Sequence, residues 1–341
     1  MKKLANVLYI LTENTYLHCE NRAICVKVGG TEKTRIPAHT IESIICLCNT
    51  TVSTPFIRFC SENNISLSFH SDTGKFYGRI YGAVSGNVLL RKTQYLWIGT
   101  RESIEIVRSI ISGKLLNSRN VLMKSARTAA EEKAEILHRS AQMISEQYTA
   151  LEHAKDIENI SGIEGAAASI YFQGFDAMLK TDSPDLLFER RSRRPPENRV
   201  NALLSFVYML LKNDMQSALE SVGLDPAAGY MHTLRPGRPS LALDLMEELR
   251  APLCDRFVVS LLNLKQIRSN DFITENGEFL LKDAARKLVI REWQLRKKEQ
   301  ITHPFLKEKI EIGLIPYCQS MLLARHMRGD LDGYPPYVWR C

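Results

Sequence analysis

The hydrophobic period of this chain changes near residue 86, and that change limits what the chain can fold into. Before it, short segments rich in Val, Ile, Tyr and Phe are separated by turn residues, as in NVLYILT, YLHCENRAICVKV, SIICLC, ISLSFHS and KFYGRIYG. That pattern is typical of β-strands. After it, apolar residues recur with the period of an α-helix. We therefore predict an α+β multidomain fold, with a small N-terminal β-sheet domain (residues 1–86) followed by a larger, mainly α-helical domain (residues 87–341).

Turn and cap residues refine this division. In the N-terminal part we expect hairpin turns at Glu20-Asn21 and at Gly74, and one helix that begins after the N-cap Ser53. In the C-terminal part Asn276-Gly277 predicts a further two-residue hairpin turn. The helices expected there are one long tract from Ser103 to about Ile157 and shorter ones over residues 164–179, 198–213, 240–263, 282–299 and 313–328.

The composition is that of an ordinary globular protein and excludes several classes. The 341 residues are 45% hydrophobic and 24% charged, and no run of uncharged apolar residues is long enough to span a membrane. The eight cysteines lack the spacing of a zinc site or a disulfide framework, so we interpret them as buried thiols of a cytoplasmic protein. The net charge of +7 favours a polyanionic partner.

One predicted helix, SLALDLMEELRAPL, carries an unusual number of acids. At 100° per residue a stripe of leucines falls on one side, and the acids fall together on another: Asp244, Glu247, Glu248 and Asp255. Like charges at such spacings cost only about 0.2–0.5 kcal/mol per pair, so these acids can form a solvated surface. The alternative is that they face a cation.

Two further residues could complete a cation site. His232 lies just upstream of this helix, and Mn²⁺ accepts imidazole beside carboxylates, although a lone histidine is more often structural. Glu164 is the only charge in residues 159–175 and is followed by a glycine and three alanines. On a closely packed helix face such a carboxylate would be protonated or would need a cation. The simpler interpretation makes Glu164 a helix-start residue that the helix dipole favours.

A basic run lies between these segments and consists of Arg190, Arg191, Arg193 and Arg194, followed by two prolines. Guanidinium groups bind phosphates in bidentate pairs, so the run is a candidate contact for a nucleic-acid backbone. The alternative is a linker that the prolines stiffen.

Several stretches together resemble a known family. The segments GIEGAAASIYF, RRSRRPPENRVNALLSFVYMLL, GYMHTLRPGRPSLALDLMEELRAPLCDRFV and THPF look like those of the CRISPR-associated integrase-endonuclease. This protein (Cas-one) is the large subunit of the complex that captures new spacers. The resemblance spans nearly the whole chain, and GRPSLALDLMEELR and GDLDGYPPYVW are most similar to the type I-C branch.

The resemblance implies an N-terminal domain that mediates dimerisation and a helical catalytic domain with one Mg²⁺ or Mn²⁺ site. It assigns the metal ligands to Glu164, His232 and Glu247, with Asp244 as a supporting carboxylate. Many family members have aspartate at the third position, where this chain has glutamate. The implied partners are DNA, a second copy of the chain and a small CRISPR-associated protein (Cas-two).

The implied reaction inserts protospacer DNA into the repeat array by attack of a 3′-hydroxyl on a phosphodiester, with hydrolysis as a side reaction. A metal-dependent DNA endonuclease and integrase is therefore our first hypothesis. The second is a non-enzymatic DNA-binding scaffold of the same type of complex, in which the acids are solvated. The third is a cytoplasmic metallohydrolase of small phosphates.

Overall fold

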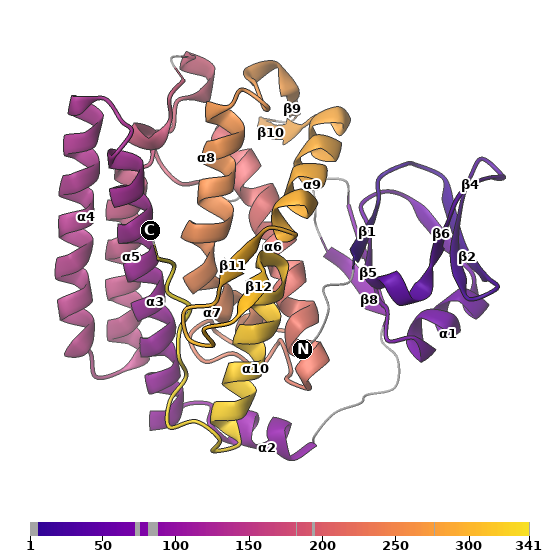
Figure 1. Ribbon diagram of the computed structural model, residues 1–341, viewed down its shortest axis with the longest axis horizontal. Coiled ribbons are helices and arrows are strands. Elements are labelled where there is room, and N and C mark those ends of the chain that lie inside the picture. The colour runs from indigo at the N-terminus through magenta and orange to yellow at the C-terminus, as the bar shows by residue number, and fades with distance from the viewer. Residues whose placement is uncertain are drawn as a thin grey trace. The chain divides into compact units, whose positions relative to one another are not determined.

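The chain divides into two compact units, described here from a computed structural model that covers residues 6–71, 76–80, 88–181, 183–192, 195–275 and 277–340. One unit is Met1–Gly86 with Asp283–Glu299, and the other is Asn87–Lys282 with Gln300–Cys341. The first is built mainly from strands and the second mainly from helices (Figure 1), which confirms the predicted α+β fold. The segment 283–299, which the sequence division assigned to the helical domain, groups with the β-sheet unit.

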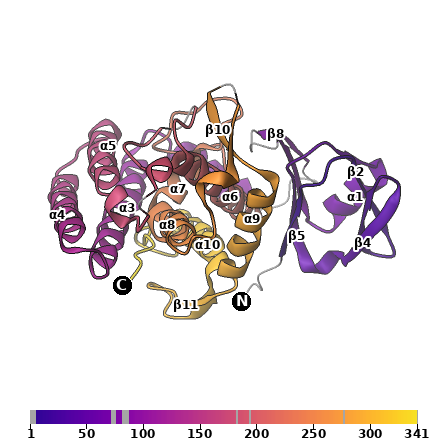
Figure 2. The same cartoon turned by 90° about the horizontal axis from the view of Figure 1, so that it is seen from above.

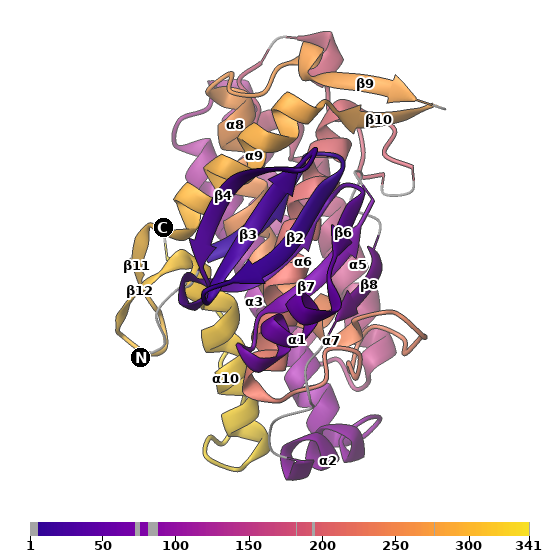
Figure 3. The same cartoon turned by 90° about the vertical axis from the view of Figure 1, so that its right-hand side faces the viewer.

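Two four-stranded sheets form the first unit. One has the order β1-β5-β7-β8, in which only the β7–β8 pair is antiparallel. The other, which faces the viewer in Figure 3, has the order β4-β3-β2-β6, in which only β2–β6 is parallel. The strands are β1 (Asn6–Ile10), β2 (Thr15–Glu20), β3 (Ala23–Val28), β4 (Thr31–Pro37), β5 (Ile41–Cys46), β6 (Thr50–Val52), β7 (Ser66–His70) and β8 (Phe76–Ile80).

Both sheets and helix α1 (Thr54–Glu62) contribute to one apolar core, which includes Ile10, Leu17, Ile24, Phe56 and Leu67. In β2 the buried Thr15 and Leu17 alternate with the exposed Tyr16, which places one face of that strand in the core. The remaining elements of the unit are the single turn η1 (Ala38–Thr40) and helix α9 (Asp283–Lys297).

The local signals of this unit were largely predictable. Ser53 caps α1, and its hydroxyl accepts a hydrogen bond from the backbone N–H of Phe56 at 3.2 Å. The β2–β3 hairpin turns one residue later than predicted, at Asn21 and Arg22, whose φ angles are 48° and 60°. Gly74, the other predicted turn, lies outside the described residues.

The second unit contains a group of long helices, α3 (Arg101–Ala126), α4 (Glu131–Glu152) and α5 (Ile157–Gln173), which lie side by side in Figures 1 and 2. Its other helices are α2 (Val88–Leu96), α6 (Arg199–Val222), α7 (Ser240–Leu249), α8 (Arg256–Asn263) and α10 (Ile315–Met327), with single turns η2 (Asp176–Met178), η3 (Pro184–Leu186), η5 (Ser269–Asp271) and η6 (Ile312–Leu314). Antiparallel pairs are formed by β9 (Phe272–Glu275) with β10 (Glu278–Leu281) and by β11 (Gln300–Thr302) with β12 (Lys309–Glu311).

The predicted β9–β10 hairpin is confirmed as an antiparallel pair. Gly277 has a φ of 81°, as its turn position requires, and Asn276 lies outside the described residues. None of the described helices combines the length and the apolar character that a membrane span needs.

The predicted helix over residues 103–157 is wrong, because the chain reverses at residues 127–130 and forms α3 and α4. No glycine or proline marks the reversal. A single helix of that length would be a rod of about 80 Å, which could not fold its own apolar stripe against itself. The packing of α3 against α4 therefore decides where the chain turns.

Helix α5 begins earlier than predicted, at Ile157. The carboxylate of Asp156 caps it by accepting a hydrogen bond from the backbone N–H of Asn159 at 2.7 Å. Glu164 therefore lies about two turns inside the helix, and its interpretation as a helix-start residue is wrong. α5 also ends earlier than predicted, at Gln173 instead of residue 179, and α6 continues to Val222, beyond the predicted residue 213.

The predicted continuous helix over residues 240–263 is interrupted by a π-helical turn, η4 (Arg250–Asp255). Pro252 lies in this turn and has no backbone N–H to donate, so the regular hydrogen-bond ladder cannot continue through it. The wider turn shifts the phase of α8 relative to that of α7, and the single helical wheel used for both segments does not hold beyond Leu249.

Candidate functional site

The predicted acidic face of α7 is not solvated. The four acids Asp244, Glu247, Glu248 and Asp255 are between 0% and 4% exposed. The interpretation as a solvated surface is therefore wrong. Each of these acids has its own set of hydrogen-bonding or ionic partners, as buried polar groups require.

Asp244 organises the loop before α7. One carboxylate oxygen accepts hydrogen bonds from the backbone N–H groups of Tyr230 at 2.6 Å and Met231 at 3.1 Å. The other accepts from the backbone N–H of His232 at 2.9 Å and lies 2.6 Å from Nδ1 of the same imidazole. Gly229 makes this approach sterically feasible, because a Cβ there would lie 2.7 Å from the Asp244 carboxylate.

The contact with Asp244 orients the imidazole of His232. When the neutral ring donates a hydrogen bond from Nδ1–H to the carboxylate, the other ring nitrogen, Nε2, carries the free lone pair. Nε2 lies 4.0 Å from a carboxylate oxygen of Glu247. His232 is 17% exposed and Glu247 is 4% exposed, so this pair lies at the edge of the protein interior.

Lys114 of α3 connects the remaining predicted ligand to this pair. Its ammonium group lies 2.7 Å from one carboxylate oxygen of Glu247 and also forms an ion pair with Glu164 of α5. The side chains of Lys114 and Glu164 are 11% and 18% exposed. Residues far apart in the sequence, on α3, α5 and α7, thus meet at one point.

Arg250 completes the charge balance. Its guanidinium lies 2.9 Å from the second carboxylate oxygen of Glu247 and packs over the ring of Tyr208 at 5.1 Å. Burial alone raises the pKa of Glu247, but the positive charges of Arg250 and Lys114 outweigh that effect and hold the pKa below its ordinary value. Glu247 is therefore ionised at neutral pH.

These residues have the donor set of a hard divalent cation. Glu164 and Glu247 supply carboxylate oxygens that share one positive charge, and His232 presents a ring nitrogen beside Glu247. Mg²⁺ and Mn²⁺ prefer carboxylate oxygen, and Mn²⁺ also accepts imidazole. The ammonium of Lys114 stands between the two carboxylates, in the position of a bridging cation. The three predicted ligands therefore have the chemistry of a metal centre, although their donor atoms do not all lie within 4.8 Å of one another as the side chains stand.

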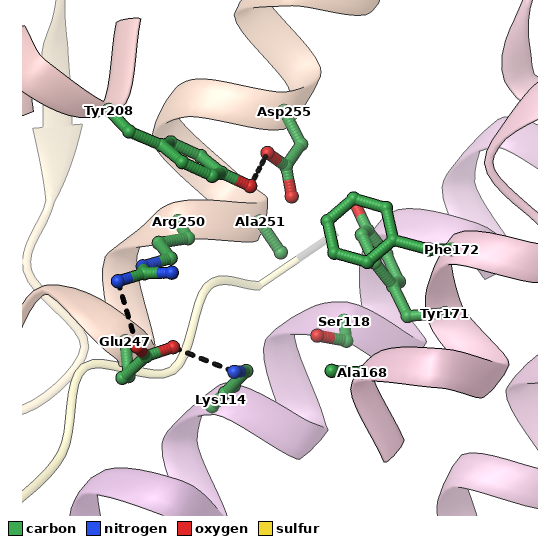
Figure 4. Close-up of a pocket in the computed structure, with 10 residues that line it drawn as sticks. All are labelled: Lys114, Ser118, Ala168, Tyr171, Phe172, Tyr208, Glu247, Arg250, Ala251 and Asp255. Atoms are coloured by element: carbon green, nitrogen blue, oxygen red, sulfur yellow. Dashed lines mark hydrogen bonds and ion pairs between the residues drawn. The ribbon is translucent and has the colours of Figure 1, made fainter. Parts of the chain in front are cut away.

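Asp255 and Tyr208 form a second polar contact next to this cluster. The Tyr208 hydroxyl donates to Asp255 at 2.6 Å. A pocket lined by both, by Lys114 and Glu247, and by Tyr171 and other side chains opens beside them (Figure 4). Burial raises the pKa of Asp255 to about 6, although the Tyr208 hydrogen bond opposes this effect.

Glu248 points away from the cluster and anchors the C-terminal segment. Its carboxylate accepts hydrogen bonds from the Tyr334 hydroxyl at 2.6 Å, the Gln319 amide at 2.8 Å and the Tyr337 backbone N–H at 3.1 Å. Burial raises the pKa of Glu248 to about 8. Asn117 of α3 joins the same network through the backbone oxygens of Glu248 and Tyr337. Glu248 therefore has a structural role.

The face of α5 that carries Gly162 and Gly165 is open, and it lies away from Glu164 on the helix. Added Cβ atoms at Gly162 and Gly165 would meet no atom within 4 Å. The expectation that small residues let α5 approach a neighbour closely is wrong at Gly165. The side chain of Glu164 is nevertheless mostly buried, because Lys114 covers it.

The four arginines of the basic run differ from one another. Arg190 is 77% exposed at its side chain and pairs with Glu197 at 2.9 Å. The guanidinium of Arg191 is directed inward, where it donates to Asn201 at 2.8 Å and to Ser205 at 3.1 Å. Arg193 and Arg194 lie outside the described residues. Of the described pair, Arg190 is therefore the one whose side chain is largely accessible.

The sequence interpretation missed Lys114 and Arg250. Lys114 is the only charge in residues 109–118, an otherwise uncharged part of α3. The same criterion drew attention to Glu164, and it would have found Lys114 if it had been applied to basic residues as well. Arg250 is one turn beyond Glu247, a spacing that puts the two side chains on one face.

A second group of potential ligands lies on the first unit. The side chains of His18, Glu20, Cys25 and Glu32 have donor atoms within 4.8 Å of one another. Arg35 pairs with Glu20 at 2.7 Å and with Glu32 at 3.2 Å, and all three side chains are at least one third exposed. An exposed ion-pair cluster accounts for this geometry.

A family model and relatives of known name match most or all of the chain. A family model described as CRISPR associated protein Cas1 matches residues 8–295. The CRISPR-associated endonuclease Cas1 1 of Chlorobaculum tepidum is 44% identical over 343 residues, and Cas1 2 of Rhodospirillum rubrum is 44% identical over 349 residues. Each alignment covers 100% of both chains.

Solved structures share the fold at lower identity. A CAS1 protein from Thermotoga maritima superposes with a TM-score of 0.83 at 23% identity, covering 98% of this chain and 100% of that one. A casposase bound to integration product has a TM-score of 0.80 at 20% identity, with coverages of 98% and 94%. A chain of a Cas6-RT-Cas1–Cas2 complex has a TM-score of 0.83 at 22% identity, with coverages of 99% and 36%. Given the family model and the full-length relatives, this chain belongs to the CRISPR-associated Cas1 family.

Proposed function

We propose that this protein is a divalent-metal-dependent DNA endonuclease and integrase. The observation that carries the proposal is the convergence of Glu164 and Glu247 on one cation beside the imidazole of His232. Buried carboxylates of this kind require a positive partner. The relatives of Chlorobaculum and Rhodospirillum bear the name endonuclease, which supports the nuclease activity.

In the proposed centre Glu164, His232 and Glu247 hold a Mg²⁺ or Mn²⁺ ion. Such an ion polarises a phosphodiester and lowers the pKa of a bound hydroxyl or water. The chain's own residues prepare the site: Asp244 fixes the tautomer and direction of His232, and Arg250 steadies the carboxylate of Glu247. Because its lone pair would be taken up as a ligand, His232 is not assigned as a general base.

We further propose that DNA is the substrate. The net charge of +7 and the exposed guanidinium of Arg190 favour a polyanion. The similar casposase, whose structure contains an integration product, supports strand transfer as the reaction.

The proposed protein partners, the location and the branch rest on fewer observations. The similar chain of a Cas6-RT-Cas1–Cas2 complex supports a small CRISPR-associated partner of the Cas2 kind. A homodimer formed through the first unit and the type I-C branch stay predictions from the sequence resemblance, and a cytoplasmic location stays a prediction from the cysteines. The relatives come from varied organisms and do not point to one branch.

The scaffold hypothesis required solvated acids, and the burial of Asp244 and Glu247 argues against it. The hypothesis of a small-phosphate hydrolase differs from ours in its substrate. A labelled duplex with 3′-hydroxyl ends, incubated with supercoiled plasmid, separates the two, because only an integrase joins the duplex to the plasmid.

The decisive variant is Glu164→Gln, which keeps the size of the side chain and removes its charge. We expect it to lose strand transfer and to bind Mn²⁺ at least about tenfold more weakly than the wild type. Glu158→Gln is the matched control, because Glu158 is an exposed acid in the first turn of the same helix. Equal activity and equal Mn²⁺ binding of the Glu164 variant and the wild type would refute the proposed centre.

A further inference from the structure

The position of Lys114 raises a conflict within the proposed metal centre. Its ammonium is bound by Glu164 and by Glu247, the two carboxylates that the proposed function assigns to the divalent ion. An ammonium carries one charge and has no lone pair, so it cannot be a ligand. The lysine and a metal therefore compete for the same two carboxylates.

The burial and the ion pairs of Lys114 hold its side chain at the proposed metal centre. The side chain extends from the interior of α3, which spans Arg101–Ala126, and is only 11% exposed. Arg250 occupies the other oxygen of Glu247 at 2.9 Å, so Lys114 is the partner that brings Glu164 to Glu247. Without a cation between them, two neighbouring carboxylates with little access to water would repel each other.

We propose that Lys114 is an internal counter-ion of the metal centre. It holds Glu164 and Glu247 together when no divalent ion is bound, and its ammonium leaves the carboxylates when a divalent ion enters. This inference rests on the proposed function, because it takes these carboxylates as metal ligands. The pocket beside the cluster, lined by Lys114 together with Ser118 and Asp255, provides a place for the released side chain (Figure 4).

The exchange has a thermodynamic consequence. Every divalent ion that binds must first break two ion pairs of Lys114, so the lysine lowers the measured metal affinity. At the same time it stabilises the metal-free fold, because it neutralises buried charge. Removal of the ammonium should therefore strengthen metal binding and weaken the metal-free protein. A lysine that merely supported the site would increase both the metal affinity and the stability of the metal-free protein.

The test compares Lys114→Met and Lys114→Gln with the wild type in Mn²⁺ titrations followed by electron paramagnetic resonance. Both variants have a side chain one atom shorter than that of lysine and remove its charge. We expect Mn²⁺ to bind about 10- to 100-fold more tightly to the variants, which corresponds to about 1.4–2.8 kcal/mol of ion pairing that no longer has to be broken. The melting temperature of the metal-free variants should be lower than that of the wild type, and Mn²⁺ should raise it by a larger increment.

Lys124→Met is the matched control, because Lys124 is an exposed lysine near the end of the same helix. It should leave the Mn²⁺ affinity and the metal-dependent increment unchanged. Unchanged or weaker Mn²⁺ binding by both Lys114 variants, with normal binding by the wild type, would overturn the counter-ion role. No Mn²⁺ binding by any of the proteins would instead refute the metal centre itself.

A measurement on the wild type covers the case in which the variants do not fold. Amine labelling followed by mass spectrometry reports how readily each lysine reacts. We expect Mg²⁺ to raise the labelling rate of Lys114 severalfold and to leave that of Lys124 unchanged. If Mg²⁺ binds and the labelling rate of Lys114 stays the same, the ammonium has not left the carboxylates and the inference is wrong.

Discussion

Replacement of Asp244 by asparagine tests how the chain positions its proposed histidine ligand. The carboxylate accepts four hydrogen bonds, two at each oxygen. One oxygen serves the backbone N–H groups of Tyr230 and Met231, and the other serves the backbone N–H and ring Nδ1 of His232. Asparagine has a single acceptor oxygen, so in Asp244→Asn the amide NH₂ must face one of these pairs of donors.

The magnitude follows from this count. Two hydrogen bonds to a charged acceptor are lost, and each contributes about 1.5–3 kcal/mol, so we expect a loss of about 3–6 kcal/mol in the free energy of unfolding. Such a loss is a large part of the stability of an ordinary domain, which is about 5–15 kcal/mol. The imidazole also loses its charged acceptor whichever way the amide turns, and for an outer-shell change of this kind a decrease in metal affinity of about 10- to 100-fold is typical.

Urea unfolding monitored by circular dichroism measures the first effect, and Mn²⁺ titration measures the second. Asp176→Asn is a suitable control, because Asp176 is a carboxylate outside the cluster that accepts one backbone N–H bond, from Phe188 at 2.9 Å. We expect the control to lose about 1–3 kcal/mol and to keep its Mn²⁺ affinity.

The reasoning fails if Asp244→Asn unfolds at the same urea concentration as the wild type. It also fails in part if stability falls while Mn²⁺ affinity stays the same, because His232 would then hold its direction without Asp244. Only a joint decrease of both quantities agrees with a carboxylate that holds the loop and the imidazole together.

Three further predictions concern other parts of the second unit. Burial raises the pKa of Asp255 from 3.8 to about 6, so protonation of this carboxyl stabilises the folded protein by about 3 kcal/mol below pH 3.8, and this stabilisation is lost as the pH rises through about 6. Urea unfolding of Asp255→Asn between pH 4 and pH 8 should lack this loss. Parallel stability profiles of the variant and the wild type against pH would contradict it. Gly229→Ala should cost about 1–3 kcal/mol, because the Cβ would lie 2.6 Å from a backbone carbon of α7, whereas Gly162→Ala, with open space around it, should gain about 0.5–1 kcal/mol in the same thermal melts. Asn117→Ala should release residues 334–340 from α3 and speed their amide hydrogen exchange by about tenfold or more, and unchanged protection would show that Asn117 does not hold the segment.

Local chemistry made much of the fold predictable. The change of hydrophobic period marks the division near residue 86, because strand and helix faces repeat with different periods. Ser53 caps α1 through one hydrogen bond between its hydroxyl and the backbone N–H three residues later. A cap of this kind depends on neighbouring residues alone, so it can be predicted from the sequence. The same holds for the antiparallel hairpin whose turn contains Gly277.

Helix ends without a local breaker were not predictable in this way. The reversal between α3 and α4 has no glycine or proline, and it is set by the burial of one helix on the other. The π-helical turn after Leu249 is a contrasting case, since Pro252 was visible in the sequence but the way the chain accommodates it was not.

For the site, the sequence by itself determined the candidates: Glu164, His232, Glu247 and the supporting Asp244 all come from residue type, from isolated charges and from the family resemblance. Only the tertiary structure decided that the acids of α7 are buried and that each has a separate role, because burial depends on what packs against a helix. It also decided that Lys114 lies between Glu164 and Glu247. A helical wheel contains no neighbouring helix, and an ion pair across three helices exists only after they have packed together.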